Sequence, residues 1–332
     1  MEMREFGRTG MKLSILGFGC GNVGGLMIRG APGDRERAVA RALEAGVNYF
    51  DTAAQYGDGQ SETNLGLVLK KLKPATVVVG TKVRLKPAEF GAIADAVAKS
   101  LEGSLKRLGM ERVDIFHLHN EITNSGGGET LSAQQVVEEV APAFERLRQQ
   151  GKIRFLGLTA TGDTAALKEV IDARAFDSAQ MVFNMLNPSA AQALPANYPA
   201  QDYGKLFDRT QAAGVGVVGI RVLAGGALSG SPERHAIASP APPPIGSALE
   251  HGGDLKRARR LMPLVREGFA ANLPEAATRF AISHPAMGTI LVGMATIQQF
   301  EQALAAVVKG PLPQAALDRL ASLQKTFAGE AR

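Results

Sequence analysis

Cysteine and tryptophan are almost missing from this chain, and so are long apolar runs. There is no tryptophan among the 332 residues, and Cys20 is the one cysteine. Because a disulfide bond needs two cysteines, none can form within the chain. Such chains are typical of reducing compartments. No run of about 18 apolar residues occurs, so no membrane-spanning helix is expected, and residues 1–10 carry charges where a signal peptide would be apolar. We therefore expect a cytoplasmic protein.

A large excess of one charge is missing as well. Lysine and arginine number 37 against 32 acidic residues, a formal net charge of +5. Short basic groups, such as Lys70, Lys71 and Lys73, are interrupted by apolar positions, which is typical of solvated helix faces rather than a nucleic-acid surface. We expect neither nucleic acid nor membrane as a partner, and a small molecule as the ligand. The oligomeric state stays open.

The length and the hydrophobic content favour one large domain. With 332 residues, 45% of them hydrophobic, the chain can form one eight-stranded α/β barrel, which needs about 250 residues. Short runs rich in Val, Ile and Phe alternate with amphipathic stretches, as in βα units around a parallel sheet. We predict a single-domain (β/α)8 TIM barrel over residues 1–332. Its expected strands are Leu13–Cys20, Asn48–Ala53, Thr76–Val83, Val113–His119, Ile153–Ala160, Ser178–Asn184, Val215–Leu223 and Gly288–Met294.

Smaller elements are expected around the barrel. Helix patterns cover 34–45 and 87–108, and Gly46 and Gly109 are expected to end them. Residues 3–6 and 12–13 predict a short N-terminal hairpin that closes the bottom of the barrel. Residues 313–327 predict an extra C-terminal helix outside the ring.

Two long segments interrupt the alternation of strands and helices. Residues 121–130 contain three consecutive glycines, and residues 231–253 contain Pro240 and the run Pro242–Pro244. Both follow expected strands, and loops of this length in a compact domain commonly cover a site. We expect both to be rim loops.

Four polar residues lie at or just beyond the ends of expected strands. They are Asp51, Tyr56, Lys82 and His119. In a parallel barrel the carboxyl ends of all strands open on one face, so residues distant in sequence meet there. Each alone has an ordinary explanation as a cap, a packing group or a solvated charge. Together, an acid, a phenol, an amine and an imidazole indicate proton transfer.

The segment Asn48–Gly57, with Asp51 ending a strand and Tyr56 in the next loop, resembles the best-known motif of the aldo-keto reductase family. Lys82 after Thr81 resembles the third-strand lysine of that family, and His119 at the end of 114–119 resembles its fourth-strand histidine. Further matches to the sequence pattern of the family follow in the same order along the chain, as far as Gln299. The resemblance implies an NAD(P)(H)-dependent oxidoreductase that interconverts an aldehyde, ketone or aldose with its alcohol or lactone.

The chemistry explains why these residue types are needed. Hydride transfer to a carbonyl places negative charge on its oxygen, which a positioned proton donor must meet. The resemblance implies that Tyr56 is this donor. We expect Lys82 to bring the pKa of the phenol down from about 10, Asp51 to hold Lys82 charged, and His119 to orient the carbonyl or share the proton. His117 lies one layer deeper on the same strand face and is expected to be a hydrogen-bonded interior histidine.

The resemblance also implies contacts to a nicotinamide cofactor. Thr159 and Gln180 match positions that hold the carboxamide, whereas Ala160 replaces an asparagine of many relatives. Arg221 is expected near the diphosphate. The full set of expected contacts is Gly21, Asn22, Asp51, Thr159, Gln180, Arg221, Leu223, Gly226, Gly293 and Gln299.

The choice between the two nicotinamide cofactors is open. Relatives that select the 2'-phosphate carry a basic residue after the glycine of strand eight, but here Gly293 is followed by Met294, Ala295 and Thr296. Phosphate recognition normally needs a cation or several donors. The habit of the family favours NADP(H), and NAD(H) remains an alternative; no metal is expected.

Three other interpretations compete with this one. Gly19, Gly21 and Gly24 satisfy a Rossmann glycine pattern, but no helix is expected at once and the next acidic strand end, Asp51, comes too late. His117 and His119 resemble a metal pair, yet a third ligand for a hydrolytic zinc is missing. A barrel that senses nicotinamide cofactor and regulates a partner, with little turnover, is the third alternative.

The absence of tryptophan leaves the substrate wall undefined. The indole that is frequent in relatives must be replaced, and Phe183, Met27 and Met185 are candidates.

Overall fold

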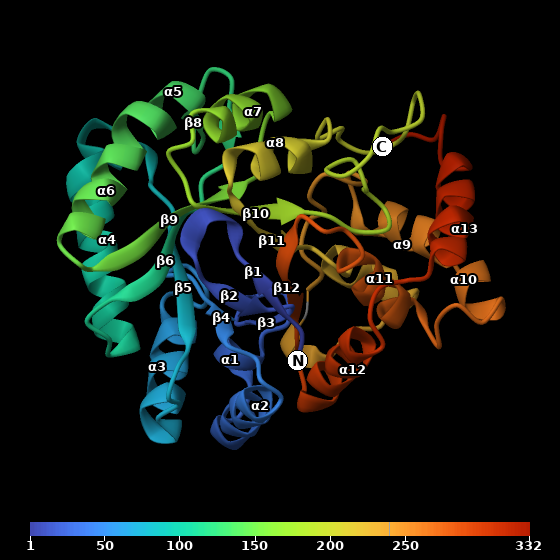
Figure 1. Cartoon of the computed structure of the whole chain (residues 1–332), viewed down its shortest axis with the longest axis horizontal. Helices are drawn as coiled ribbons and strands as arrows, with labels where there is room; N and C mark the ends of the chain where they lie inside the picture. The colour runs from blue at the N-terminus through green and yellow to red at the C-terminus, as the bar shows by residue number, and fades with distance from the viewer. Residues whose placement is uncertain (239) are drawn as a thin grey trace.

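Eight parallel strands close into a barrel in the order β3-β4-β5-β6-β9-β10-β11-β12, and β12 pairs with β3 to complete the ring. The computed structural model describes residues 1–238 and 240–332. Figure 1 shows the strands at the centre with helices around them. The predicted (β/α)8 fold is confirmed. The barrel strands are β3 (Leu16–Gly19), β4 (Tyr49–Asp51), β5 (Val78–Val83), β6 (Val113–Leu118), β9 (Ile153–Ala160), β10 (Ser178–Val182), β11 (Gly216–Ile220) and β12 (Met287–Gly293).

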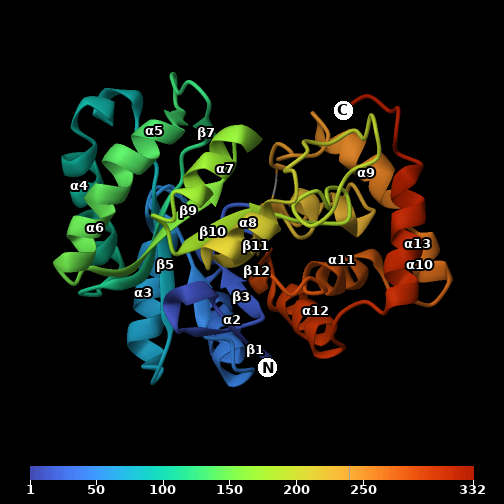
Figure 2. The ribbon, with the colours of Figure 1, turned by 45° about the horizontal axis from the view of Figure 1, so that its top comes forward.

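Helices cover the outside of the barrel, and α9, α10, α11 and α13 lie together on one side in both views (Figures 1 and 2). The expected C-terminal helix is α13. The α-helices are α1 (Leu26–Arg29), α2 (Pro32–Glu44), α3 (Gln60–Leu72), α4 (Ile93–Leu108), α5 (Ala133–Gln135), α6 (Ala141–Gln149), α7 (Thr164–Asp172), α8 (Leu206–Ala213), α9 (His251–Arg259), α10 (Pro263–Arg266), α11 (Leu273–Ala281), α12 (Ile297–Val308) and α13 (Gln314–Lys325).

One expected helix has a different start. Residues 87–108 were expected to form a single helix, but Pro87–Ala92 form the 3-10 helix η2 and the α-helix begins at Ile93. The prediction was wrong there because Ala92 has φ −147° and ψ 48°, which breaks the α-helical pattern. Gly46 (φ +83°) and Gly109 (φ +64°) end their helices in the left-handed conformation that favours glycine, as expected.

The N-terminal hairpin closes the bottom of the barrel as predicted. Strands β1 (Met3–Glu5) and β2 (Lys12–Ser14) pair antiparallel around the 3-10 turn η1 (Gly7–Thr9). The fully buried Phe6 packs against two glycines, since a Cβ at Gly216 or Gly288 would lie 2.8 or 2.7 Å from its ring.

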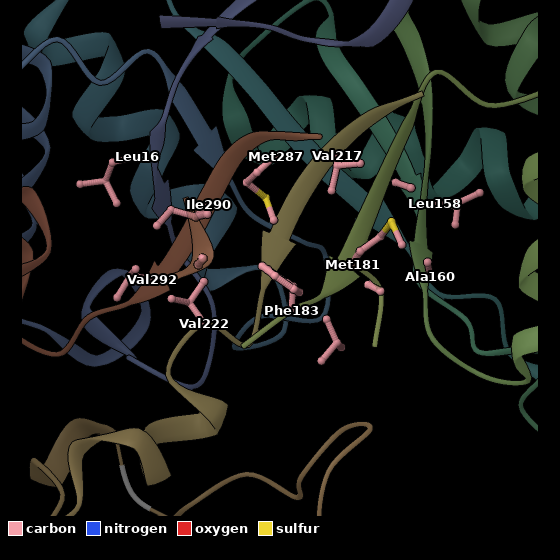
Figure 3. Packing of buried hydrophobic residues seen from close by; sticks show 14 of the residues in the cluster. Leu16, Leu158, Ala160, Met181, Phe183, Val217, Val222, Met287, Ile290 and Val292 are labelled. Carbon is pink, nitrogen blue, oxygen red and sulfur yellow. The ribbon is translucent and has the colours of Figure 1, made fainter. Parts of the chain in front are cut away.

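Alternate residues of each strand face the helices and the barrel interior. Leu158, Ala160 and Met181 belong to the hydrophobic layer between strands and helices, part of which is shown in Figure 3. Their neighbours Thr159 and Gln180 have the opposite orientation and point inward. The interior of the barrel is therefore where polar side chains collect.

Glycines make room for rings in this interior. A Cβ at Gly157 would lie 2.3 Å from His117 Cδ2, and one at Gly80 would lie 2.6 Å from Tyr49 Oη. His117 Nε2 lies 3.2 Å from Ser178 Oγ, so His117 is the hydrogen-bonded interior histidine that was expected.

Both long loops are at the carboxyl ends of the strands. The first loop begins with the short strand β7 (Ile122–Thr123) and is followed by the short strand β8 (Leu131–Ser132). Its three consecutive glycines, Gly126–Gly128, have φ angles of +66°, +102° and +57°. The second, which follows the 3-10 helix η4 (Ala224–Ser229), includes η5 (Ala236–Ala238); Ser239 lies outside the described residues. Arg234 of this loop donates to Gly225 O at 2.6 Å and to Val23 O at 3.3 Å.

The close contact at Gly157 predicts a stability effect. We expect Gly157→Ala to lower the free energy of unfolding by about 1–3 kcal/mol, because the added carbon overpacks a filled interior. Urea denaturation followed by circular dichroism measures this. Gly91→Ala is the matched control, since a Cβ there meets no atom within 4 Å. Equal unfolding free energies for the two variants would contradict the packing argument.

Candidate active site

The structure brings the four predicted residues together at the carboxyl ends of β4, β5 and β6. Asp51 ends β4, Tyr56 lies in the following loop, Lys82 is in β5 and His119 directly follows β6. Lys82 Nζ contacts Asp51 Oδ1, and it donates to Thr52 O at 2.8 Å and to Tyr56 Oη at 3.2 Å. The rings of Tyr56 and His119 meet edge to face at 5.9 Å between centroids. Residues from three strands thus form one constellation.

Two further residues hold the second oxygen of the Asp51 carboxylate. Tyr49 Oη donates to Asp51 Oδ2 at 2.9 Å, and Gln180 Nε2 donates to it at 2.6 Å. Gln180 was expected as a cofactor contact, whereas Tyr49 was missed. Its position two residues before Asp51, on the same face of the strand, was the available signal.

Lys82 and Asp51 form a buried ion pair. Lys82 is 0% exposed and Asp51 is 3% exposed. Burial works to lower the pKa of Lys82, but Asp51 and then Tyr56 raise it, and the net pKa lies above the usual value of 10.5. Lys82 is therefore a stable ammonium group, as expected from its partner.

Tyr56 keeps its proton more firmly than the sequence argument anticipated. Burial raises the pKa of the phenol, and the opposing effect of the Lys82 ammonium does not cancel it, so the net pKa lies above 10. Lys82 does lower the pKa of Tyr56, as expected, but the prediction did not consider the removal of water, which raises the pKa by more. The result is a protonated phenol at neutral pH.

His119 is a neutral imidazole. Burial, followed by the positive charges of Lys82 and Arg84, lowers its pKa from 6.5 to about 3. Its Nδ1 lies 2.8 Å from Gln55 Oε1. Gln55 comes just before Tyr56 in the chain and was not singled out from the sequence.

A second buried carboxylate supports β5 from the helix side. Glu62 of α3 is fully buried and accepts hydrogen bonds from Thr81 Oγ1 at 2.5 Å and from Arg107 Nε at 2.6 Å. Thr81 directly precedes Lys82. Glu62 therefore links α3 and α4 to the strand that carries the lysine.

Thr159 and Gln180 are neighbours across the β9–β10 pair. Thr159 Oγ1 is buried and has no hydrogen-bond partner among the described residues. Gln180 uses its amide nitrogen for Asp51, and no described residue donates to its amide oxygen. An unpaired hydroxyl and an amide oxygen fit a carboxamide, which offers both a donor and an acceptor. Ala160 faces the hydrophobic layer and adds no polar group.

The segment after β11 has an unusual backbone. Arg221, Ala224 and Gly226 have φ of +58°, +48° and +104°, which is costly for the two residues that are not glycine and is typical of functional segments. The Arg221 side chain donates to Pro243 O of the second rim loop at 3.0 Å. Leu223, another expected contact, is half-buried beside them.

The remaining expected contacts lie around the ends of β3 and β12. Gly21 faces the Tyr56 ring, from which a Cβ would be 3.5 Å away, and Asn22 O accepts from Arg29 Nη2 at 2.8 Å. Gly293 is exposed at the end of β12. Gln299 Oε1 accepts from Ala295 N at 2.6 Å, just before helix α12, and the Thr296 side chain caps that helix by accepting from Gln299 N.

The Rossmann interpretation of the glycines near β3 does not hold. The strand is followed by a turn and by α1, which has only four residues. A Cβ at Gly24 would lie 2.0 Å from Met294 N, so this glycine permits the approach of the backbone just after β12 rather than opening a nucleotide-binding helix.

Phe183 does not replace the missing indole. It is 3% exposed, and its ring stacks on Phe280 at 4.7 Å and lies 5.1 Å from Phe207. These partners belong to α11 and α8, so Phe183 points toward the helices.

Two features are absent from the part of the chain that the structure describes. It contains no group of three or more His, Cys, Asp or Glu side chains placed to hold a metal ion. None of its helices combines the length and hydrophobicity that crossing a bilayer requires.

The buried ion pair predicts a large stability effect. Lys82→Met leaves the buried Asp51 carboxylate without its cation, and we expect a loss of about 3–5 kcal/mol in the free energy of unfolding. Lys71→Met removes the exposed pair with Glu36 and should cost less than about 1 kcal/mol. Chemical denaturation of both variants checks this, and similar losses would argue against a buried charge pair.

The pKa of His119 predicts a pH dependence. Between pH 6.5 and about 3, the unfolded chain binds a proton at this side chain that the folded chain does not. The free energy of unfolding therefore falls as pH falls through this window. We expect His119→Asn to flatten the slope by up to about 1.4 kcal/mol per pH unit. Parallel curves of unfolding free energy against pH for the wild type and His119→Asn would refute the role of His119 in this pH dependence.

Comparisons with known proteins agree with this geometry. The sequence matches the model of the Aldo/keto reductase family over residues 15–325. It is 30% identical over 317 residues to L-galactose dehydrogenase of Arabidopsis thaliana, covering 93% of this chain and 89% of that protein. It is 27% identical over 317 residues to aflatoxin B1 aldehyde reductase member 4 of Homo sapiens, covering 88% and 89%. An aldo-keto reductase of Bacillus halodurans, in its holo form, has a TM-score of 0.71 at 25% identity over 99% of this chain and 98% of that one. The chain therefore belongs to the aldo/keto reductase family and is an NAD(P)-dependent oxidoreductase.

Proposed function

We propose that this enzyme interconverts an aldehyde, ketone or aldose with its alcohol or lactone, with Tyr56 as the acid/base. The observation that carries the proposal is the hydrogen-bonded series Asp51–Lys82–Tyr56 with its protonated phenol at the carboxyl end of the barrel. Two relatives, an L-galactose dehydrogenase and an aflatoxin B1 aldehyde reductase, support this substrate range by the activities in their names.

The proton moves between Tyr56 and the substrate oxygen. In reduction, the phenol donates its proton to the carbonyl oxygen of the substrate while the carbonyl carbon gains a bond to hydrogen. In oxidation, the phenolate accepts the proton of the substrate hydroxyl. The Lys82 ammonium, 3.2 Å from Tyr56 Oη, stabilises the phenolate, and Asp51 keeps Lys82 charged and oriented. A bound nicotinamide cofactor supplies or accepts the hydride. Neutral His119 positions the substrate beside the phenol.

The cofactor would be held by the predicted contacts at the ends of β3, β9, β10, β11 and β12. The unpaired Thr159 hydroxyl and the Gln180 amide oxygen fit the carboxamide. We propose NADP(H), following the habit of the family; the lack of a basic residue directly after Gly293 leaves NAD(H) as the alternative. Comparative titration with NADPH and NADH decides between them.

We also propose that the chain is one barrel domain, acts in the cytoplasm and takes a small-molecule substrate. The single cysteine and the βα pattern over nearly the whole chain support this. Expression with a fluorescent tag in the native cell tests the location.

Tyr56→Phe separates binding from chemistry. We expect an unchanged Kd for the cofactor and a decrease of kcat by about a hundredfold or more, because the proton donor is lost while the ring remains. Fluorescence titration and stopped-flow hydride transfer measure the two. Undiminished turnover would reject Tyr56 as the acid/base, and tight cofactor binding without turnover of any aldehyde or sugar by the wild type would favour the sensing alternative.

Thr159→Val tests the carboxamide contact. We expect the Kd of the cofactor to rise by about threefold to tenfold, which corresponds to the free energy of one neutral hydrogen bond. The free protein should lose no stability, because the Thr159 hydroxyl has no partner among the described residues. Thr289→Val is the matched control, since Thr289 Oγ1 is also buried and unpaired but lies deeper in β12. Equal effects of the two variants on Kd would count against the contact.

A further inference from the structure

An arginine lies at the mouth of the barrel, beside the histidine of the candidate site. Val83 and Leu85, on either side of Arg84, are buried in the hydrophobic layer between strands and helices. Because side chains alternate between the two faces of an extended chain, Arg84 points to the same side as Lys82. It is one step nearer to the carboxyl end of the barrel, and it is exposed where Lys82 is fully buried.

Strand pairing sets Arg84 next to His119. β5 and β6 pair in register as far as Val83 and Leu118. One step further along the two chains, Arg84 comes level with His119, whose backbone N–H donates to Val83 O at 2.7 Å. Neighbouring strands lie about 4.8 Å apart, and the positive charge of Arg84 contributes to the low pKa of the imidazole. The guanidinium is therefore close to the place where a substrate would react.

One carboxylate of the first rim loop contacts this guanidinium. Arg84 Nη2 donates to Glu129 Oε2 at 2.8 Å, and no described residue accepts a hydrogen bond from Arg84 Nε or Nη1. Both side chains are open to water, with exposed fractions of 44% for Arg84 and 70% for Glu129. Glu129 directly follows Gly127 and Gly128, where an added Cβ would meet no atom within 4 Å. An exposed ion pair of this kind is weak, so another oxyanion can take the place of Glu129.

We propose that Arg84 binds an oxyanion of the substrate, a carboxylate or a phosphate, in the place that Glu129 occupies in the free enzyme. The preferred substrates are then aldehydes or ketones that carry such a group a short distance from the reacting carbon. The inference rests on the proposed function, because it names the substrate class of the same site.

The geometry of a guanidinium favours this exchange. Its N–H groups lie in one plane and match two oxygens of a carboxylate or a phosphate. Glu129 accepts from Nη2 alone, whereas a substrate anion can accept from two nitrogens of Arg84 at once. The exchange therefore gains a charge-assisted hydrogen bond, while the Glu129 carboxylate returns to water.

The charges around the reacting position favour an anion as well. The Asp51 carboxylate is matched by the Lys82 ammonium. The Tyr56 phenol and the His119 imidazole are neutral. Arg84 is therefore the charged group that a substrate meets beside the imidazole, and a neutral substrate leaves this charge unused.

Paired substrates test the selection. Succinic semialdehyde and butanal differ in a carboxylate, and glyceraldehyde 3-phosphate and glyceraldehyde differ in a phosphate. We expect Arg84→Met to lower the ratio of kcat/KM values, anionic over neutral, by about tenfold to a hundredfold, which corresponds to a hydrogen bond between charged groups. An effect of Arg84 on the imidazole acts on both members of a pair and cancels in the ratio. A loss confined to one pair identifies the anion, and unchanged ratios in both pairs overturn the proposal.

Glu129→Gln should act in the opposite direction. Removal of the competing carboxylate should raise the same ratio by about twofold to fivefold, the range of an exposed ion pair. An unchanged or lower ratio contradicts the exchange with Glu129. Arg154→Met is the matched control and should leave the ratio as it is. Arg154 has a similar exposed fraction, 40%, and pairs with Asp114 at 2.7 Å, but it lies near the amino end of β9.

Anion binding is also measured without turnover. Succinate and inorganic phosphate are titrated by calorimetry into enzyme saturated with the oxidised cofactor. We expect the Kd of at least one of them to rise about tenfold or more in Arg84→Met, and to rise with added sodium chloride in the wild type, because salt screens exposed charges. Equal Kd values in the two proteins for both anions overturn the proposal. If the wild type binds an anion through Arg84 but reduces none of the four aldehydes, the proposed function fails and the anion site stands.

Discussion

The rest of the candidate site depends on one buried ion pair. Moving an ammonium and a carboxylate out of water costs several kcal/mol per ion, which is recovered only when both are fully hydrogen-bonded. Here Lys82 has three oxygen partners, and Asp51 accepts from Lys82, Tyr49 and Gln180. These residues come from β4, β5, β10 and the loop after β4. The pair is therefore stable only when the barrel is closed.

Burial also decides the protonation of the neighbouring groups. Removal from water raises the pKa of the Tyr56 phenol and lowers that of the His119 imidazole, so both are neutral at ordinary pH while Lys82 keeps its charge. A protonated phenol beside a fixed cation can give up its proton when negative charge develops next to it, because the cation stabilises the phenolate that remains.

The fold was predictable to a large extent. All eight barrel strands, the hairpin and α13 follow from the alternation of short apolar runs with amphipathic stretches. The break at Ala92 was not predictable, because amphipathic spacing is nearly the same in 3-10 and α-helical turns over a few residues. Of the residues in the candidate site, the four at strand ends were predicted from their position, their type and the resemblance to a family motif, and the structure brings them together. The net pKa of Tyr56 was not predicted, since burial depends on the packing of distant segments.

The sequence by itself determined the barrel class and the four polar residues at the strand ends, because strand periodicity and local motifs are properties of adjacent residues. Only the tertiary structure decided the hydrogen-bond partners of those residues. Tyr49 and Gln180 on Asp51, Gln55 on His119 and Glu62 behind Thr81 are contacts at 2.5–2.9 Å. Distances this short depend on strand register, barrel closure and the room left by interior glycines, and these arise when the whole chain folds.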